Sequence, residues 1–148
     1  MEKVEVLQKS PLFEMLSQPE LDLLAELSRP RRYAAGDVVF EEGDLGDSLY
    51  VLMNGEVEVV HKDEQGGTNV IASLRSPEFF GEMSLIDKEF RSATVRAKSD
   101  ATMLQLTADN LASFRRNYRD GFAFLVINIA RVLSNRLREA NARLVRAA

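Results

Sequence analysis

The most informative stretch of the sequence is residues 79–95, which read Phe79-Phe80-Gly81-Glu82-Met83-Ser84-Leu85-Ile86-Asp87-Lys88-Glu89-Phe90-Arg91-Ser92-Ala93-Thr94-Val95. Gly81, at a turn that opens a short helix, lets backbone N–H groups approach an anion closely. Arg91 supplies a fixed positive charge and a forked donor set that suits phosphate. The Glu82 carboxylate can accept hydrogen bonds from ribose hydroxyls. The loop therefore indicates a sugar-phosphate site; the alternative is a glycine turn with a Glu82–Arg91 ion pair on the surface.

Short β-rich runs flank this loop on both sides. The Asn54-Gly55 pair is a strong hairpin signal, because a type I′ turn needs a positive φ at both central positions. Residues 56–59 alternate between acid and valine, as in a strand with one solvated face. This spacing predicts an antiparallel barrel or jelly roll rather than a parallel sheet. The strand candidates are Asp37–Phe40, Leu49–Met53, Val57–His61, Asn69–Ser73, Ala93–Ala97 and Thr102–Leu106.

Helical periodicity appears at both ends of the chain. The apolar spacing over residues 1–29, with serine–proline helix starts, predicts two or three short helices. Thr107 is expected to cap a short helix that runs through Phe114. Residues 120–147 are predicted to form one long helix with an apolar stripe. Its first half, residues 122–133, is apolar on more than one side, so we expect it to lie between the barrel and another surface, such as a second subunit.

Length and composition exclude several classes of protein. The chain has 148 residues, no cysteine and one histidine. Disulfides, thiolate nucleophiles and metal sites with two imidazoles are therefore excluded, and no metal site is expected. No serine or cysteine nucleophile can be placed beside a histidine, so we do not expect an enzyme. No apolar run approaches 18 residues and no signal peptide begins the chain, so a soluble, cytoplasmic protein without a membrane partner is expected.

The net charge of −4 hides a split between the two ends of the sequence. Residues 1–114 carry a net charge of −10, whereas residues 115–148 carry +6, with eight arginines against two acids. Such asymmetry can mark an arm that binds nucleic acid. However, five arginines flank the apolar stripe of the predicted long helix, as charges flank a helix seam: Arg131, Arg136, Arg138, Arg143 and Arg146. Nucleic acid is therefore not the expected partner.

Residues 79–95 resemble the phosphate-binding cassette of the cyclic nucleotide-binding domain family, whose pattern is F-G-E-[LM]-[AS]-L followed by R-[ST/A]-A-[ST]-V. Every position of that pattern is matched by FGEMSL at 80–85 and RSATV at 91–95. The upstream family pattern is also matched, by GDVVF at 36–40, GD at 43–44, SLYV at 48–51 and Gly55. The resemblance covers nearly the whole chain. One departure is Pro77, where the family usually has a glycine.

The resemblance implies a mainly β fold with flanking helices, of the α+β class. The expected architecture is an eight-stranded antiparallel jelly-roll barrel with N-terminal helices and a long C-terminal helix. One domain would occupy residues 1–148. Its N-terminal helices would lie at 1–30, its barrel at 31–106 with the cassette at 79–95, and its C-terminal helices at 107–148.

In this family a cyclic nucleotide binds inside the mouth of the barrel. By position, Arg91 would pair with the cyclic phosphate and Glu82 would accept the ribose 2′-OH. The ligand-binding residues that the resemblance implies are Gly81, Glu82, Met83, Ser84, Arg91, Ser92 and Ala93, with backbone amides of Gly81, Glu82, Ser84 and Ala93 forming part of the anion cradle. A lid residue from the final helix would cover the base, and the candidates are Leu133, Arg136, Leu137 and Ala140. Ser92 favours cyclic AMP over cyclic GMP, because family members that prefer cyclic GMP often carry threonine there.

The expected function is that of a regulatory sensor that captures a cyclic nucleotide and transmits its occupancy through the C-terminal helix. That helix could also form a homodimer, and a downstream protein would read it; no other cofactor is expected. The resemblance extends to bacterial catabolite activator-type regulators, which follow this domain with a helix-turn-helix. The sequence leaves no length for that motif, so we expect a stand-alone sensor or the sensor half of a larger regulator. The alternative is a structural dimerisation module that keeps the fold without a ligand.

Overall fold

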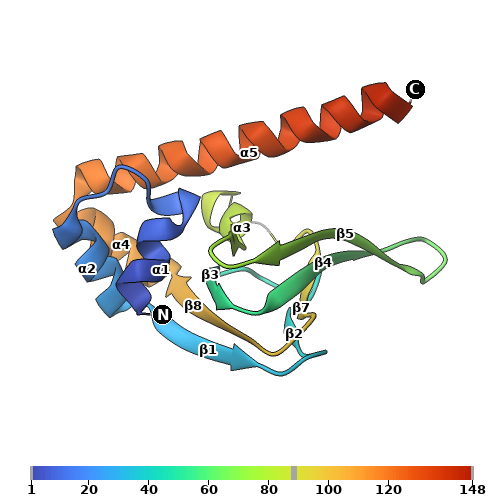
Figure 1. The fold of residues 1–148 in the computed structure, drawn as a ribbon, viewed down its shortest axis with the longest axis horizontal. Coiled ribbons are helices and arrows are strands. Elements are labelled where there is room, and N and C mark those ends of the chain that lie inside the picture. Colours follow the sequence, from blue (N-terminus) through green and yellow to red (C-terminus); the bar gives the residue numbers. More distant parts are fainter. Residues whose placement is uncertain (1, 88–89, 148) are drawn as a thin grey trace.

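The structure is a computed structural model that describes residues 2–87 and 90–147 (Figure 1). Three helical segments come first: α1 (Lys3–Lys9), the 3-10 helix η1 (Pro11–Phe13) and α2 (Gln18–Leu27). Eight strands follow: β1 (Arg29–Tyr33), β2 (Val38–Phe40), β3 (Ser48–Asn54), β4 (Glu56–Lys62), β5 (Thr68–Arg75), β6 (Phe79–Phe80), β7 (Thr94–Ala97) and β8 (Ala101–Thr107). The helix α3 (Glu82–Asp87) lies between β6 and β7, and α4 (Ala108–Asn117) and α5 (Arg119–Ala147) end the chain.

The strands form two antiparallel sheets of four strands each. One has the order β1-β8-β3-β6 and the other the order β2-β7-β4-β5. The prediction of a barrel is therefore confirmed only in part, since in the described residues no ladder joins the two sheets into a closed ring. Two of the edge strands, β2 and β6, have only three and two residues. Strands this short form few hydrogen bonds with their neighbours. The two sheets are therefore held together mainly by side chains packed between them.

Strand β3 explains how one sheet packs on both of its faces. Successive side chains of a strand point to opposite faces, and the hydrophobic run from Leu49 to Leu52 is buried at every position. Leu49 and Val51 join the cluster shared with the helices, whereas Tyr50 and Leu52 join the cluster between the sheets. The β3 layer is therefore covered by helices on one face and by the second sheet on the other.

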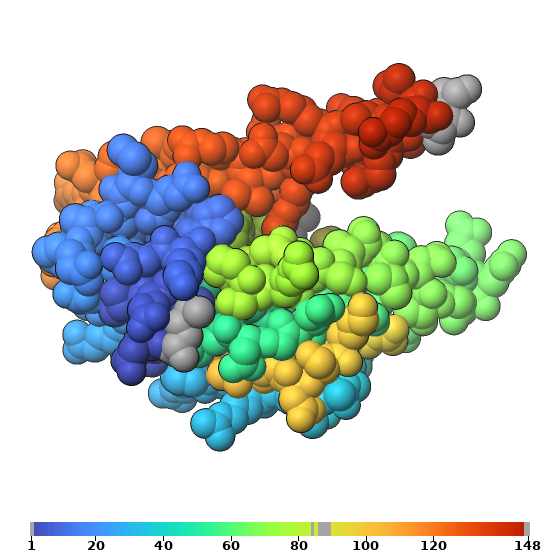
Figure 2. Space-filling view, viewed as in Figure 1, coloured from blue at the N-terminus to red at the C-terminus, as the bar shows by residue number. Residues whose placement is uncertain are grey.

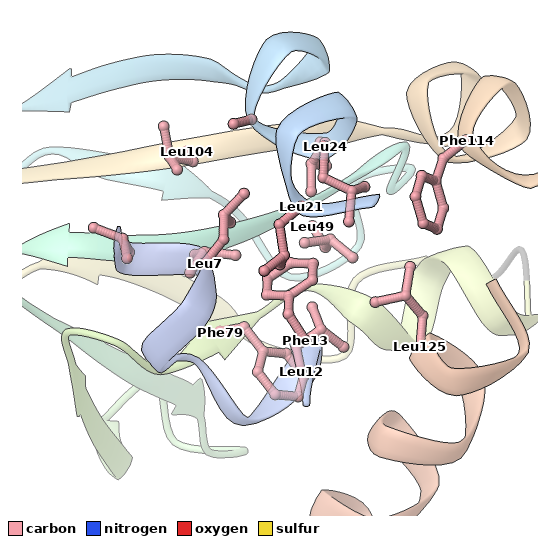
Figure 3. Close-up of a cluster of buried hydrophobic side chains, with 14 of the residues drawn as sticks. Leu7, Leu12, Phe13, Leu21, Leu24, Leu49, Phe79, Leu104, Phe114 and Leu125 are labelled. Atoms are coloured by element: carbon pink, nitrogen blue, oxygen red, sulfur yellow. The ribbon is translucent and has the colours of Figure 1, made fainter. Parts of the chain in front are cut away.

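The cluster beneath the helices is drawn in Figure 3. Leu7, Leu12 and Phe13 from the N-terminal segments contact this cluster together with Leu49 and Phe79 from the sheet. Phe114 of α4 and Leu125 of α5 complete it from the C-terminal side (Figure 3). The two ends of the chain thus pack together over one face of the β3 sheet.

Helix α5 divides into two halves that differ in their surroundings. In the anchored half, residues 119–133, Leu125 and Ile129 are buried in the core, and Asn128 is 1% exposed. The Asn128 side-chain amide donates hydrogen bonds to the backbone carbonyls of Leu12 at 2.9 Å and Glu14 at 2.8 Å. The projecting half, residues 134–147, runs toward the same end of the molecule as the β4–β5 hairpin, and its end stands clear of that hairpin in Figures 1 and 2. No helix among the described residues is both long enough and apolar enough to cross a membrane.

Several local predictions are confirmed. The first 29 residues contain the short helices α1, η1 and α2, and Ser17 forms a capping box with Glu20 at the start of α2. Thr107 caps α4 through a second capping box with Asn110, although α4 runs on to Asn117 rather than ending at Phe114. The long helix begins at Arg119, one residue earlier than predicted.

The predicted hairpin at Asn54-Gly55 is wrong. Strands β3 and β4 meet at this point but belong to different sheets, and Gly55 has a φ of +79° while Asn54 does not have a positive φ. A side chain at Gly55 would collide with the Asp100 carbonyl and with Ala101. The glycine therefore lets the chain cross from one sheet to the other against a neighbouring backbone. Two strands, β1 and β6, were absent from the predicted set.

Candidate functional site

Gly81 occupies the turn between β6 and α3, and both its backbone and its surroundings require glycine. Its φ is +86°, a conformation that residues with a side chain rarely adopt. A Cβ atom at this position would lie 2.9 Å from Nη1 of Arg91 and 3.0 Å from the Ser48 carbonyl oxygen. The absence of a side chain thus allows Arg91 to lie directly against the turn.

Arg91 is buried beside this turn, with 6% of its surface exposed. Its Nη1 donates to the Gly81 carbonyl and its Nη2 donates to the Ser48 carbonyl, each at 2.8 Å. The guanidinium carbon lies 3.9 Å from the centroid of the Phe40 ring, within the range of a cation–π contact. Nε has no hydrogen-bond partner among the residues that the structure describes. Burial lowers the pKa of the Arg91 guanidinium, because desolvation disfavours its charged form.

Glu82, the first residue of α3, is a second buried ionisable group, with 5% of its side chain exposed. Its Oε1 lies 3.5 Å from Nη1 of Arg136, which is in the projecting half of α5. Burial raises the pKa of the Glu82 carboxyl, and the nearby charges of Arg136 and Arg91 partly oppose that rise. The alternative of a surface Glu82–Arg91 ion pair is wrong, because both side chains are buried and Arg91 binds backbone carbonyls instead.

The other cassette residues have different surroundings. Met83 is 44% exposed, Ser92 is exposed and Ala93 is half-buried. The side chain of Ser84 lies outside what the structure describes, as do residues 88 and 89 altogether. The structure thus brings Gly81, Glu82 and Arg91 together and leaves Met83 and Ser92 at the surface.

The four predicted lid candidates are spread along the middle of α5. Leu133 is partly buried and packs against the helical core cluster, Ala140 is half-buried, and Leu137 is 62% exposed. Arg136 reaches the cassette through its contact with Glu82, and its guanidinium carbon also lies 5.6 Å from the centroid of the Phe79 ring. Of these four residues, Arg136 is the one whose side chain joins α5 to the cassette.

Two partners of Arg91 were not predicted from the sequence. The sequence places Phe40 in a strand and in the upstream family pattern, but its stacking on Arg91 depends on how the sheets pack. Ser48 contributes a backbone carbonyl, and every residue has one, so the sequence carries no signal for it. The upstream motif that contains Ser48 was the available hint.

Two hollows lie near the cassette. The smaller, of about 240 Å³, is lined by Glu78, Phe79 and Pro11 on one side and by Asn135, Arg136 and Glu139 of α5 on the other. A larger one, of about 1020 Å³, lies among η1, α4 and the anchored half of α5 and includes Leu85 of α3. Neither Glu82 nor Arg91 lines the larger hollow, so its size says nothing about the cassette.

Two of the tail arginines lie against acids of the body. Arg131 pairs with Glu14 at 3.2 Å, and Arg136 contacts Glu82. Arg138 contacts Asn135 of the same helix at 3.4 Å. Within residues 2–87 and 90–147, no group of three or more histidine, cysteine or acidic side chains is placed to hold a metal ion.

Comparison with known proteins connects this geometry to a family. The cyclic nucleotide-binding domain family matches residues 30–118, a range that holds the whole cassette and both sheets apart from the first residue of β1. The chain therefore belongs to the cyclic nucleotide-binding domain family.

Individual relatives agree with this assignment. The chain is 38% identical over 136 residues to the cyclic AMP receptor protein of Thermus thermophilus, covering 91% of the chain and 61% of that relative. It is 37% identical over 103 residues to a cAMP-dependent protein kinase regulatory subunit of Aspergillus fumigatus, covering 70% of the chain and 24% of the relative. The crystal structure of a cyclic nucleotide-binding domain from Methylobacillus flagellatus superposes with a TM-score of 0.86 at 28% identity, covering 99% of the chain and 83% of that structure.

The chain thus spans less than two thirds of the length of these two curated relatives. One of these relatives is named as a receptor for cyclic AMP and the other as the regulatory subunit of a cAMP-dependent kinase. The described residues thus form a mixed α and β fold with two antiparallel sheets, and this fold matches that of the M. flagellatus domain.

Proposed function

We propose that this chain binds cyclic AMP at the cassette and signals its occupancy through α5. The observation that carries the proposal is the state of Arg91. Its guanidinium is 6% exposed, and no carboxylate among the described side chains lies within ion-pair distance of it. A buried charge without a counter-ion is costly. An anion that enters beside Arg91 relieves that cost, and a cyclic phosphate carries one negative charge in a compact group.

The other residues of the site have complementary roles in this proposal. Glu82 accepts a hydrogen bond from the ribose 2′-OH, since an ionised carboxylate only accepts. Backbone amides of Gly81, Glu82, Ser84 and Ala93 complete the cradle for the phosphate, and Met83 lines it. The family membership supports this arrangement, because the matched range contains each of these residues.

Cyclic AMP is preferred to cyclic GMP on two grounds. The serine at position 92 lacks the extra methyl group of the threonine that many cyclic GMP-binding members of the family carry. In addition, two of the relatives described above are named for cyclic AMP. Ser92 is exposed and can adjust to either base, so the preference is expected to be modest.

Helix α5 is proposed both to report occupancy and to join two copies of the chain. Its projecting half presents Leu137, Leu144 and Val145 to solvent, with exposed fractions of 62%, 68% and 76%. Large apolar side chains in a row on an unpartnered helix favour association with another helix. A homodimer through α5 would cover these residues, and a nucleotide that moves α5 would be sensed across the pair.

The test of the ligand is isothermal titration calorimetry with cyclic AMP and cyclic GMP on the wild type and on Arg91→Ala. Hydrogen bonds to a charged group contribute about 1.5–3 kcal/mol, so Arg91→Ala should weaken binding by roughly 10- to 150-fold. Arg96→Ala is the matched control, since Arg96 is a nearby arginine that pairs with Glu58 and is 39% exposed. It should bind like the wild type.

Three results would decide against the proposal. A wild type that binds neither nucleotide at millimolar concentration would favour the structural dimerisation module instead. Equal affinity in Arg91→Ala and the wild type would remove the assigned role of Arg91. Tighter binding of cyclic GMP than of cyclic AMP would reverse the proposed preference.

For the dimer, light scattering after size exclusion should give twice the monomer mass for the wild type and the monomer mass for Leu137→Ser/Leu144→Ser.

A further inference from the structure

The contact between Arg136 and Glu82 joins the projecting half of α5 to the site. Arg136 Nη1 lies 3.5 Å from Glu82 Oε1, and the two side chains are 40% and 5% exposed. Arg136 also lies over the Phe79 ring, at 5.6 Å from its centroid, and lines the small groove between β6 and α5. One cation from α5 therefore reaches the buried carboxylate that the proposed function assigns to the ribose.

No other described cation takes this position. Arg91, the other arginine near Glu82, gives both of its Nη groups to the carbonyls of Gly81 and Ser48. Arg136 is the one described basic side chain within ion-pair distance of Glu82. Two residues further along, Arg138 turns to Asn135 of its own helix. Among the described side chains, Arg136 is therefore the nearest counter-charge of the Glu82 carboxylate.

We propose that Arg136 is a positioning residue for the ribose subsite: it holds Glu82 ionised and oriented while that carboxylate accepts the ribose 2′-OH. The inference rests on the proposed binding of a cyclic nucleotide. Arg136 makes a single contact with one carboxylate oxygen, and a carboxylate has about four lone-pair sites. A ribose hydroxyl can therefore join Arg136 at Glu82 rather than displace it.

This arrangement differs from that of a lid residue. A lid residue contacts the base and is indifferent to the sugar, whereas Arg136 acts through Glu82 and responds to the sugar hydroxyl. Because coupling between two sites is reciprocal, a nucleotide with a 2′-OH also strengthens the contact of α5 with the cassette. A nucleotide without that hydroxyl binds the cassette and leaves α5 unaffected through this route.

The experiment compares two ligands on four chains by calorimetry. The ligands are cyclic AMP and its 2′-deoxy analogue, and the chains are the wild type, Arg136→Gln, Glu82→Gln and the double variant. Site-to-site coupling spans roughly 5- to 150-fold, and Arg136 is partly exposed, so Arg136→Gln should weaken binding of cyclic AMP by about fivefold. It should leave binding of the 2′-deoxy analogue unchanged. In the Glu82→Gln background, Arg136→Gln should have no further effect on either ligand.

Arg138→Gln is the matched control, because it removes the same charge from the same helix without touching Glu82. It should bind both ligands like the wild type. An equal loss for the two ligands in Arg136→Gln would show that Arg136 contacts the base or phosphate and would overturn the inference. Tighter binding of cyclic AMP in Arg136→Gln would also overturn it, because Arg136 would then compete with the ribose. A wild type that binds neither ligand would instead refute the proposed function itself.

Discussion

The two halves of α5 belong to one continuous helix but are held by different forces. The anchored half buries Leu125, Asn128 and Ile129 against η1 and the helical core, whereas the projecting half exposes Leu137 and Leu144. In the anchored half, packing decides the position of the helix. In the projecting half, the described polar contact with the body is that of Arg136 with Glu82. The difference means that packing fixes the helix at its base, whereas one polar contact with the body is described further along.

The largest expected effect is a loss of stability when a buried leucine of the anchored half is truncated, compared with an exposed leucine of the projecting half. Leu125→Ala, at a residue 4% exposed, should lower the free energy of unfolding by about 2–5 kcal/mol, because it leaves a cavity in the core. Leu144→Ala, at a residue 68% exposed, should change it by less than about 0.5 kcal/mol. Urea unfolding of the chain at low concentration measures both. Similar losses in the two variants would mean that the projecting half is packed in solution.

A smaller effect is expected from the polar anchor. Asn128→Ala would leave the carbonyls of Leu12 and Glu14 without their side-chain donor, and orphaned buried groups cost about 1–3 kcal/mol. Asn135→Ala is the matched change in the projecting half, where the described hydrogen bond of the side chain is with exposed Arg138, and it should be within about 0.5 kcal/mol of the wild type. Thermal unfolding compares the two. Equal stabilities would show that water replaces Asn128 without cost.

The smallest expected effect is the pH dependence that Glu82 gives to the free energy of unfolding, at the point where the projecting half contacts the site. Burial raises the pKa of Glu82 above its ordinary value of 4.5, with Arg136 and Arg91 as the opposing charges. The folded chain therefore binds a proton at a higher pH than the unfolded chain. As the pH falls from neutral towards 4.5, the contribution of Glu82 to the free energy of unfolding should rise, and below 4.5 it should be constant.

The measurement is the stability difference between the wild type and Glu82→Gln at several pH values without nucleotide. This difference should shift in favour of the wild type as the pH is lowered. In the Arg136→Gln background the shift should begin at a higher pH, because one opposing charge has been removed. If this stability difference depended on pH in the same way in both backgrounds, Arg136 of the projecting half would not contact Glu82 in solution.

The sequence was sufficient for features that depend on local chemistry. The capping residues Ser17 and Thr107 and the cassette residues Gly81, Glu82 and Arg91 could be identified because each acts through its own side chain or backbone conformation. The family resemblance then supplied the ligand class. The apolar stripe also predicted that residues 122–133 are covered on more than one side. Leu125 and Ile129 are buried, whereas Val126 and Ile127 are 48% and 49% exposed, so a second covering surface stays a prediction.

Features that depend on non-local packing could not be predicted in the same way. Asn54-Gly55 has the sequence of a tight hairpin, but the close approach of the Asp100 backbone makes Gly55 a crossing between sheets. Strand β6 has two residues, too few for a periodic pattern. The pairing of Glu82 with Arg136 joins residues 54 positions apart, and no pattern in either segment specified that these two would meet.

The Ser48 carbonyl makes one contact of Arg91 independent of the side chain at position 48, which is itself buried and accepts a hydrogen bond from Gln105. Arg91 is held there by a main-chain atom, and a substitution at position 48 changes the side chain while keeping that acceptor. The position of the acceptor is fixed by β3, whose two faces are both buried. A substitution in this strand is therefore expected to affect the stability of the fold before it displaces this acceptor. Under the proposed function, exposed positions such as Ser92 can therefore change while the backbone acceptor that orients Arg91 stays in place.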